Sequence, residues 1–190
     1  RKKGSLKVSL PKRCPSCNTD LVKIDGEAIL RCTMGLDCPA QRIGALIHFV
    51  SRNALNIDGL GERIIELLVD KNLVLNFADL FRLEIKDIVD LEGFGEKSAT
   101  NLIRSIQESR DTTLPRFIYS LGIREVGEAT AMNLALNFNS ITNFLSAKEE
   151  DLLEINDIGP VASNFIKEFL AIEENISLVR DLITLGVNPK

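Results

Sequence analysis

The feature that most constrains this chain is a glycine-bearing turn that recurs four times at nearly constant spacing. The four turns read "IDGLGER", "LEGFGEK", "LGIREVGEA" and "INDIGPV". Their last glycines, Gly61, Gly95, Gly127 and Gly159, are separated by 34, 32 and 32 residues. A constant period of this size marks a repeated supersecondary unit, so we expect an array of four similar pieces.

The residues around each turn predict what that unit is. Apolar residues at three- and four-residue spacing, as in "ERIIELLVDKNLV", predict amphipathic helices on both sides of the turn. Glycine lets the backbone turn sharply between these helices, while an apolar residue beside it enters the core. These apolar residues are Leu60, Phe94, Val126 and Ile158. The pattern predicts four helix-hairpin-helix units, arranged as two pairs, with hairpins near residues 57–62, 91–96, 121–128 and 155–160.

The geometry of such hairpins indicates a function. The first N–H groups of a helix have no partner within it, and the positive end of the helix dipole favours an anion there. A surface of this kind binds the DNA backbone without reading bases. One glycine turn would mean little, but four at one period favour DNA binding over a purely structural role. The residues expected at this surface are Gly59, Gly61, Gly93, Gly95, Gly122, Gly127 and Gly159, flanked by Ser51, Arg52, Arg63, Lys97 and Arg124.

The fourth hairpin departs from the pattern in two places. Asp157 stands where the first glycine of a Gly-x-Gly turn would be. Pro160, at the predicted first position of the next helix, has no N–H to donate. We therefore expect the fourth hairpin to contribute least to phosphate binding.

The four cysteines lie within 25 residues, in the stretch "CPSCNTDLVKIDGEAILRCTMGLDC". The Cys-x2-Cys and Cys-x5-Cys pairs predict a structural zinc site with ligands Cys14, Cys17, Cys32 and Cys38. Two disulfides are the alternative, which is disfavoured because the chain shows no secretion signal. The segment between the pairs, "LVKIDGEAILR", predicts a β-hairpin that turns at Asp25-Gly26.

The same segment contains Lys-x-Asp-Gly, the spacing at which a nucleotidyltransferase presents its nucleophilic lysine. Lys23 has only 22 residues before it and lies between the two cysteine pairs. A nucleophilic lysine needs a buried pocket that lowers its pKa, and a small zinc hairpin cannot build one. We interpret Lys23 as a hairpin residue. The only histidine, His48, is expected to pack or to cap a helix, because four cysteines already complete a zinc site.

Charge and composition narrow the class of protein. The 190 residues are 45% hydrophobic and 26% charged, which is ordinary for a folded globular chain. Residues 1–50 carry nine basic and four acidic side chains, whereas the rest carries 14 and 23. The basic end is a candidate contact for nucleic acid. Neither a signal peptide nor a long apolar run is present, so a cytoplasmic protein with no membrane partner is expected.

In these motifs the chain resembles the zinc-finger and helix-hairpin-helix region of bacterial NAD-dependent DNA ligases. The matching stretches include "CPSC", "RCTMGLDCPAQ", "HFVSRNALNIDGLGERIIELLV" and "RFIYSLGIREVGEATAMNLA". The resemblance implies two regions, a basic lead-in with a four-cysteine zinc finger over residues 1–43 and a helix-hairpin-helix domain over residues 44–190. It also implies a monomeric bacterial parent enzyme.

The resemblance further implies that the parent enzyme seals nicks in duplex DNA. Its lysine takes AMP from NAD, passes it to the 5′-phosphate at the nick, and the 3′-hydroxyl then displaces the AMP, with Mg²⁺ as a further cofactor. In this family the adenylation domain and an OB-fold precede the zinc finger and a BRCT domain usually follows. We therefore expect a fragment that binds nicked DNA, needs Zn²⁺, and holds no catalytic or NAD-binding residue itself.

Two other classes of function fit the repeats. The chain could be an accessory helix-hairpin-helix DNA-binding protein of repair or recombination. Alternatively, its acidic helices could form a protein-interaction array capped by the zinc hairpin. The ligase interpretation requires a second Lys-x-Asp-Gly several hundred residues upstream in the parent gene, which separates it from both.

Overall fold

The structure, a computed structural model, describes residues 10–23 and 29–190 of the chain. The chain forms two compact units, one ending at Arg42 and the other running from Ile43 to Lys190. The boundary falls inside helix α1 (Pro39–Val50). The four cysteines belong to the first unit and the four glycine turns belong to the second.

The first unit is built around a small antiparallel sheet. Strand β1 (Val22–Lys23) pairs with β2 (Leu30–Arg31), and a short 3-10 helix, η1 (Gly35–Asp37), follows. The predicted turn at Asp25-Gly26 lies outside the described residues. The antiparallel pairing of the two strands on either side of it agrees with the predicted hairpin.

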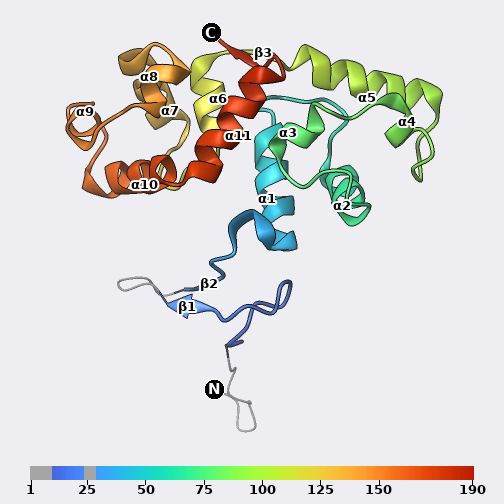
Figure 1. Ribbon diagram of the computed structural model, residues 1–190, viewed down its shortest axis with the longest axis horizontal. Helices are drawn as coiled ribbons and strands as arrows, with labels where there is room; N and C mark the ends of the chain where they lie inside the picture. The colour runs from blue at the N-terminus through green and yellow to red at the C-terminus, as the bar shows by residue number, and fades with distance from the viewer. Residues whose placement is uncertain (1–9, 24–28) are drawn as a thin grey trace, which may run out of the picture. The chain divides into compact units, whose positions relative to one another are not determined.

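The second unit is almost entirely helical, which confirms the mainly α fold expected from the sequence. In Figure 1, α6 and α11 run between α2 to α5 on one side and α7 to α10 on the other. The elements of this unit after α1 are α2 (Glu62–Asp70), α3 (Phe77–Leu80), α4 (Ile85–Ile88), α5 (Glu96–Glu108), β3 (Asp111–Thr112), α6 (Leu114–Ser120), α7 (Glu128–Phe138), α8 (Ile141–Leu145), α9 (Glu149–Leu153), α10 (Pro160–Ala171), α11 (Glu173–Thr184) and β4 (Asn188–Pro189).

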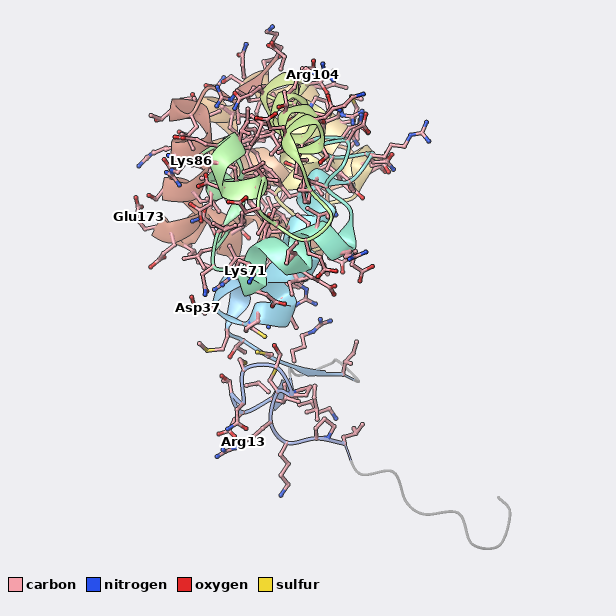
Figure 2. All side chains as sticks on the ribbon, turned by 90° about the vertical axis from the view of Figure 1, so that its right-hand side faces the viewer. Arg13, Asp37, Lys71, Lys86, Arg104 and Glu173 are labelled. Carbon is pink, nitrogen blue, oxygen red and sulfur yellow. The ribbon has the colours of Figure 1, made fainter. Side chains whose placement is uncertain are left out.

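The helices that follow the glycine turns are amphipathic, as their sequence spacing predicts. On α5 the buried residues are Ala99, Leu102 and Ile106, three and four positions apart, so they share one face. The polar residues of α5 occupy the opposite face, with Arg104 exposed (Figure 2). Burial of this apolar stripe, rather than helix propensity alone, holds the helix in place.

Aromatic packing forms the middle of the core. Phe49 of α1 is fully buried and stacks on Phe77 of α3, with ring centroids 4.4 Å apart. The Phe81 ring meets the Phe49 ring edge-on, with the ring centroids 6.4 Å apart. Offset and edge-on arrangements suit the charge distribution of aromatic rings and add to the stabilisation from burial alone. The end of α1 is thereby fixed to the first half of the second unit.

A short parallel ladder closes the second unit. Strand β3, which lies between the two halves of the repeat array, pairs with β4 at the far end of the chain. The Lys190 N–H donates to the Thr112 carbonyl at 3.0 Å, and the Lys190 side chain meets Asp111 at 2.9 Å. That ammonium group holds the pKa of Asp111 below its ordinary value. Residues nearly eighty positions apart therefore tie the second half of the array to the first.

Two buried side-chain polar atoms among the described residues of the second unit lack a hydrogen-bond partner, Arg110 Nε and Ser163 Oγ. Ser163, on α10, is fully buried, and its hydroxyl makes no hydrogen bond to any described residue. The residues four positions after the other three turn glycines, Ile65, Ala99 and Ala131, are also fully buried but apolar. An unsatisfied buried hydroxyl costs stability because it loses its hydrogen bonds to water.

Replacing Ser163 with Ala should therefore raise the free energy of unfolding, by roughly 1 kcal/mol. Urea denaturation followed by circular dichroism would measure the change. Ser120→Ala is the matched control, since that hydroxyl is equally buried but donates to the Phe117 carbonyl at 2.7 Å. The control should be neutral or destabilising. A loss of stability in Ser163→Ala would contradict the assignment of an unpaired hydroxyl.

Candidate zinc centre and nucleic-acid interface

The four cysteine sulfurs of the first unit converge on one point. All four Sγ atoms lie within 4.8 Å of one another, with Cys14 and Cys38 3.8 Å apart and Cys17 and Cys32 3.4 Å apart. Thiolates bound tetrahedrally to one zinc at about 2.3 Å would be separated by about 3.8 Å, whereas a disulfide needs about 2.05 Å. The cysteines are free. The spacing fits a metal site and not the disulfide alternative.

Backbone hydrogen bonds shape the loop that presents the first two cysteines. The Cys14 N–H donates to the Thr19 carbonyl at 2.8 Å, and the Asn18 N–H donates to the Cys14 carbonyl at 2.9 Å. Asn18 adopts positive φ, a conformation that asparagine tolerates better than most residues. The second pair is anchored by Gln41, whose side-chain amide donates to the Cys32 carbonyl at 2.9 Å.

The thiols of this cluster have unequal acidities. Hydrogen bonds from the Thr19 hydroxyl and backbone lower the pKa of Cys17 to about 6. A backbone hydrogen bond from Met34 favours the Cys32 thiolate, but burial and the three neighbouring thiols outweigh it and raise the pKa of Cys32 to about 11. Adjacent thiolates repel one another, so a divalent cation is needed for all four to ionise.

Lys23 lies apart from any enclosed site. It is the second residue of β1, and its side chain is exposed. An exposed ammonium keeps its hydration and lacks the desolvation that activates a lysine nucleophile. This position agrees with the interpretation of Lys23 as a hairpin residue.

In the second unit, the four turns share one backbone geometry. We define hairpins 1 to 4 as residues 57–61, 91–95, 123–127 and 155–159. In each, the fourth residue donates its N–H to the carbonyl of the first, at 3.4, 3.0, 3.1 and 3.2 Å respectively. The third residue has positive φ in all four. This combination is typical of a type II turn.

The glycine that ends each hairpin is also the N-cap of the next helix. These residues are Gly61, Gly95, Gly127 and Gly159. Their backbone is extended, so the conformation does not require glycine. A Cβ added at any of the four would meet nothing within 4 Å. The open space leaves the first N–H groups of α2, α5, α7 and α10 accessible to a ligand.

The third residue of the hairpins differs between the two halves of the array. It is Gly59 in hairpin 1 and Gly93 in hairpin 2, but Glu125 in hairpin 3 and Asp157 in hairpin 4. The position of Asp157 agrees with the departure seen in the sequence. Glu125 was not predicted from the sequence, although it lies two residues before Gly127, just as Gly59 lies two residues before Gly61.

Gly122 was expected in the third turn but lies just before it. It follows α6, has a φ of +67°, and a Cβ there would come within 3.4 Å of the His48 ring. His48 donates from Nε2 to the Tyr119 carbonyl at 2.7 Å and meets the Tyr119 ring edge-on. His48 therefore caps the end of α6, which confirms the predicted packing or capping role.

The basic residues expected near the hairpins have different surroundings. Arg63 forms an exposed ion pair with Glu92 of hairpin 2 at 3.5 Å, and Lys97 is exposed on the first turn of α5. Arg124 of hairpin 3 lies over the Phe165 ring of α10, 4.1 Å from its centroid. A guanidinium stacked on an aromatic face is held in one orientation.

The loop after α1 leads into hairpin 1 and also contacts the helix that follows hairpin 3. The side chain of Arg116 donates to the carbonyls of Arg52 and Ala54, at 2.5 and 2.9 Å, which fixes the loop. Asn53 donates to the carboxylate of Glu128, the first residue of α7, at 2.7 Å. Ser51 is half-buried at the start of this loop and the Arg52 side chain is exposed.

Hairpins 1 and 2 open into one groove. Its volume is about 580 Å³, and both third-position glycines, Gly59 and Gly93, line it. Polar side chains of α5, including Asn101 and Arg104, form another wall. Acidic residues of the groove are Asp58, Glu92 and Glu108, so its charge is mixed rather than uniformly basic.

The matches to known families follow these structural divisions. Residues 13–40 match the NAD-dependent DNA ligase C4 zinc finger domain. Residues 51–108 match a SAM-like helix-hairpin-helix tandem, and residues 116–179 match the helix-hairpin-helix motif. The first tandem contains hairpins 1 and 2, and the second match contains hairpins 3 and 4.

Relatives with curated names match almost the entire chain. The DNA ligase of Hahella chejuensis is 47% identical over 188 residues, which is 99% of this chain and 28% of that ligase. Over almost its whole length the chain is thus similar to DNA ligases, and its four-cysteine segment matches the zinc finger of the NAD-dependent class. The DNA ligase of Cellvibrio japonicus is 46% identical over 181 residues, covering 95% of this chain and 27% of that ligase. The chain thus spans just over a quarter of the length of these relatives.

The zinc-finger match contains the four-cysteine cluster, and the two helix-hairpin-helix matches contain the four hairpins. The resemblance drawn from the sequence is confirmed at the level of family and fold. Among the helices of the described residues, none has the length and apolar character needed to cross a membrane.

Metal analysis should find about one zinc per chain, and Cys32→Ser should lose it and unfold the first unit. The hydroxyl cannot replace the thiolate as a zinc ligand, and the small sheet has little apolar core to hold it together. Lys23→Ala is the control, because this exposed residue lies in the same sheet and should leave the zinc content unchanged. A folded, zinc-free Cys32→Ser protein would contradict a structural metal site.

Proposed function

We propose that this chain is the part of an NAD-dependent DNA ligase that binds duplex DNA at a nick, while residues outside the chain catalyse nick sealing. The observation that carries the proposal is the open glycine at the N-cap of α2, α5, α7 and α10. Four helix starts with accessible N–H groups, on one repeated scaffold, suit the regularly spaced phosphates of a DNA backbone.

Phosphate oxygens would accept hydrogen bonds from the backbone N–H groups at the hairpins, whose donors are preorganised by the turn. Arg52, Arg63, Lys97 and Arg124 would add positive charge beside them, and the Ser51 hydroxyl a further donor. Because the unit as a whole is acidic, binding depends on these local donors rather than on a general positive field. None of the contacts involves a base edge, so we expect little sequence preference.

The parent enzyme would seal nicks through enzyme-adenylate and DNA-adenylate intermediates, using NAD and Mg²⁺. Residues 1–43 would form the zinc finger and residues 44–190 the helix-hairpin-helix domain. Zn²⁺ held by Cys14, Cys17, Cys32 and Cys38 would have an architectural role, since four thiolates leave no open position for water. We place the adenylation, OB-fold and BRCT domains on the same polypeptide and expect a monomeric cytoplasmic protein.

Binding to nicked duplex DNA should be strongly salt-dependent, and Gly95→Leu should weaken it about tenfold. The leucine side chain would occupy the space through which a phosphate reaches the start of α5, where the structure has no neighbour within 4 Å. Fluorescence anisotropy at several salt concentrations would measure the affinity. The matched control is Gly44→Leu, another exposed glycine with an open Cβ position, on α1.

Both variants should remain folded, because neither substitution creates a clash. Equal affinity of Gly95→Leu and the unsubstituted chain would remove hairpin 2 from the DNA surface. Absence of any salt-sensitive DNA binding by the unsubstituted chain would refute the proposed function itself.

Incubation of the chain with NAD labelled in its adenylate moiety should leave Lys23 unmodified. Lys23 is exposed on β1, so its ammonium keeps its hydration and is not activated as a nucleophile. Mass spectrometry of the peptide containing Lys23 would detect an added AMP. Such an adduct, lost in Lys23→Arg, would overturn the assignment of a non-catalytic segment.

A further inference from the structure

The two hairpin pairs differ in residue type at the third position of the turn. The third residue has positive φ in every hairpin, so the four positions are equivalent. In the first pair it is Gly59 or Gly93, which carries no side chain. In the second pair it is Glu125 or Asp157, both exposed. A phosphate that approaches hairpin 3 or 4 therefore meets a carboxylate two residues before the N-cap glycine.

The two pairs also differ in charge at a second position, in the helix that follows each hairpin. The second residue of the helix after each hairpin is Arg63 in hairpin 1 and Lys97 in hairpin 2, both exposed. The equivalent residues after hairpins 3 and 4 are Ala129 and Val161, also exposed but uncharged. At these two positions the first pair combines a glycine with a cation, and the second pair combines a carboxylate with an uncharged residue. At the second turn position the charges are reversed, with Asp58 and Glu92 in the first pair and Arg124 and Asn156 in the second.

The surroundings reinforce this contrast. Residues 43–110, which hold the first pair, carry eight basic and eleven acidic side chains, a net charge of −3. Residues 111–190 carry six and twelve, a net charge of −6. In addition, α10 begins at Pro160, which has no N–H to offer. Arg124, stacked on Phe165, is the cation that the turns of the second pair provide.

Two features of the first pair favour one continuous contact with a DNA strand. Gly59 and Gly93 line the same groove, so a sugar-phosphate strand could run past both turns. Arg63 of the first hairpin's helix already reaches Glu92 of the second hairpin at 3.5 Å. Both side chains are largely exposed, which makes this ion pair weak and easily exchanged for a phosphate.

We propose that the two hairpin pairs contribute unequally to DNA binding, with hairpins 1 and 2 carrying most of the affinity for the DNA backbone and Glu125 and Asp157 weakening phosphate binding at hairpins 3 and 4. This inference rests on the proposed function, because it names which part of the proposed DNA surface carries the affinity. The backbone N–H groups of hairpins 3 and 4 then contribute less to the affinity than those of hairpins 1 and 2.

The first test compares two double variants of the 190-residue chain that remove the same charge. Arg63→Ala with Lys97→Ala should weaken binding to a nicked duplex about tenfold and reduce the slope of log K against log salt by about two. Lys71→Ala with Lys148→Ala is the matched control, since both lysines are exposed and lie away from the hairpin turns; Figure 2 labels Lys71. The control should change the affinity less than about twofold.

The second test changes only charge at the third turn position. Glu125→Gln with Asp157→Asn should strengthen binding about threefold, because two carboxylates near the phosphates are neutralised without change of shape. In the first pair, Gly93→Asp should bind about threefold more weakly than Gly93→Asn. Both residues tolerate the positive φ of Gly93, and no atom lies within 4 Å of the new Cβ, so the two variants should be equally stable.

The outcomes separate this inference from the proposed function. If the unsubstituted chain does not bind DNA, the proposed function is wrong and the inference falls with it. If the chain binds DNA but the two double-alanine variants lose equal affinity, the function stands and the division between pairs is overturned. Unchanged affinity after neutralising Glu125 and Asp157 would likewise overturn the role assigned to these carboxylates.

Discussion

A single backbone hydrogen bond, from the N–H of the fourth turn residue to the carbonyl of the first, organises each repeat of the second unit. In these type II turns the third residue adopts positive φ, and the fourth residue packs in or against the core. Leu60, Val126 and Ile158 are buried at that position, which anchors the turn in the core. The fifth residue is then a glycine N-cap whose N-terminal helix donors face outward. The exposed donors and the buried anchor are consequences of the same turn.

Long-range contacts convert four repeats into one rigid unit. Phe49 stacks on Phe77, the His48 side chain caps α6, and β4 pairs with β3 between the two halves of the array. Such contacts matter for a backbone-binding surface because the phosphates of duplex DNA are regularly spaced. Hairpins that moved independently would lose entropy on binding, whereas a packed array presents its donors already in place. The zinc cluster has the corresponding role in the first unit, where little apolar surface is available.

The sequence was most informative where chemistry is local. The Cys-x2-Cys and Cys-x5-Cys pairs identified all four converging sulfurs, and the spacing of the final glycines located every hairpin. The third hairpin shows the limit of this approach. Gly122 was expected in the third turn, yet the residue with positive φ in that turn is Glu125. A non-glycine residue there is disfavoured but tolerated when the surrounding packing fixes the turn.

By itself, the sequence predicted the number and position of the turns, the four-cysteine cluster and the likeness to DNA ligases, because these depend on residue type and short spacing. Only the tertiary structure decided which side chains stand beside each turn: Arg63 against Glu92, Arg124 over Phe165, and Asn53 against Glu128. It also joined Asp111 to Lys190 across the array. These pairs arise from the packing of helices distant in the chain, and neither local propensity nor periodicity specifies which exposed side chains that packing brings together.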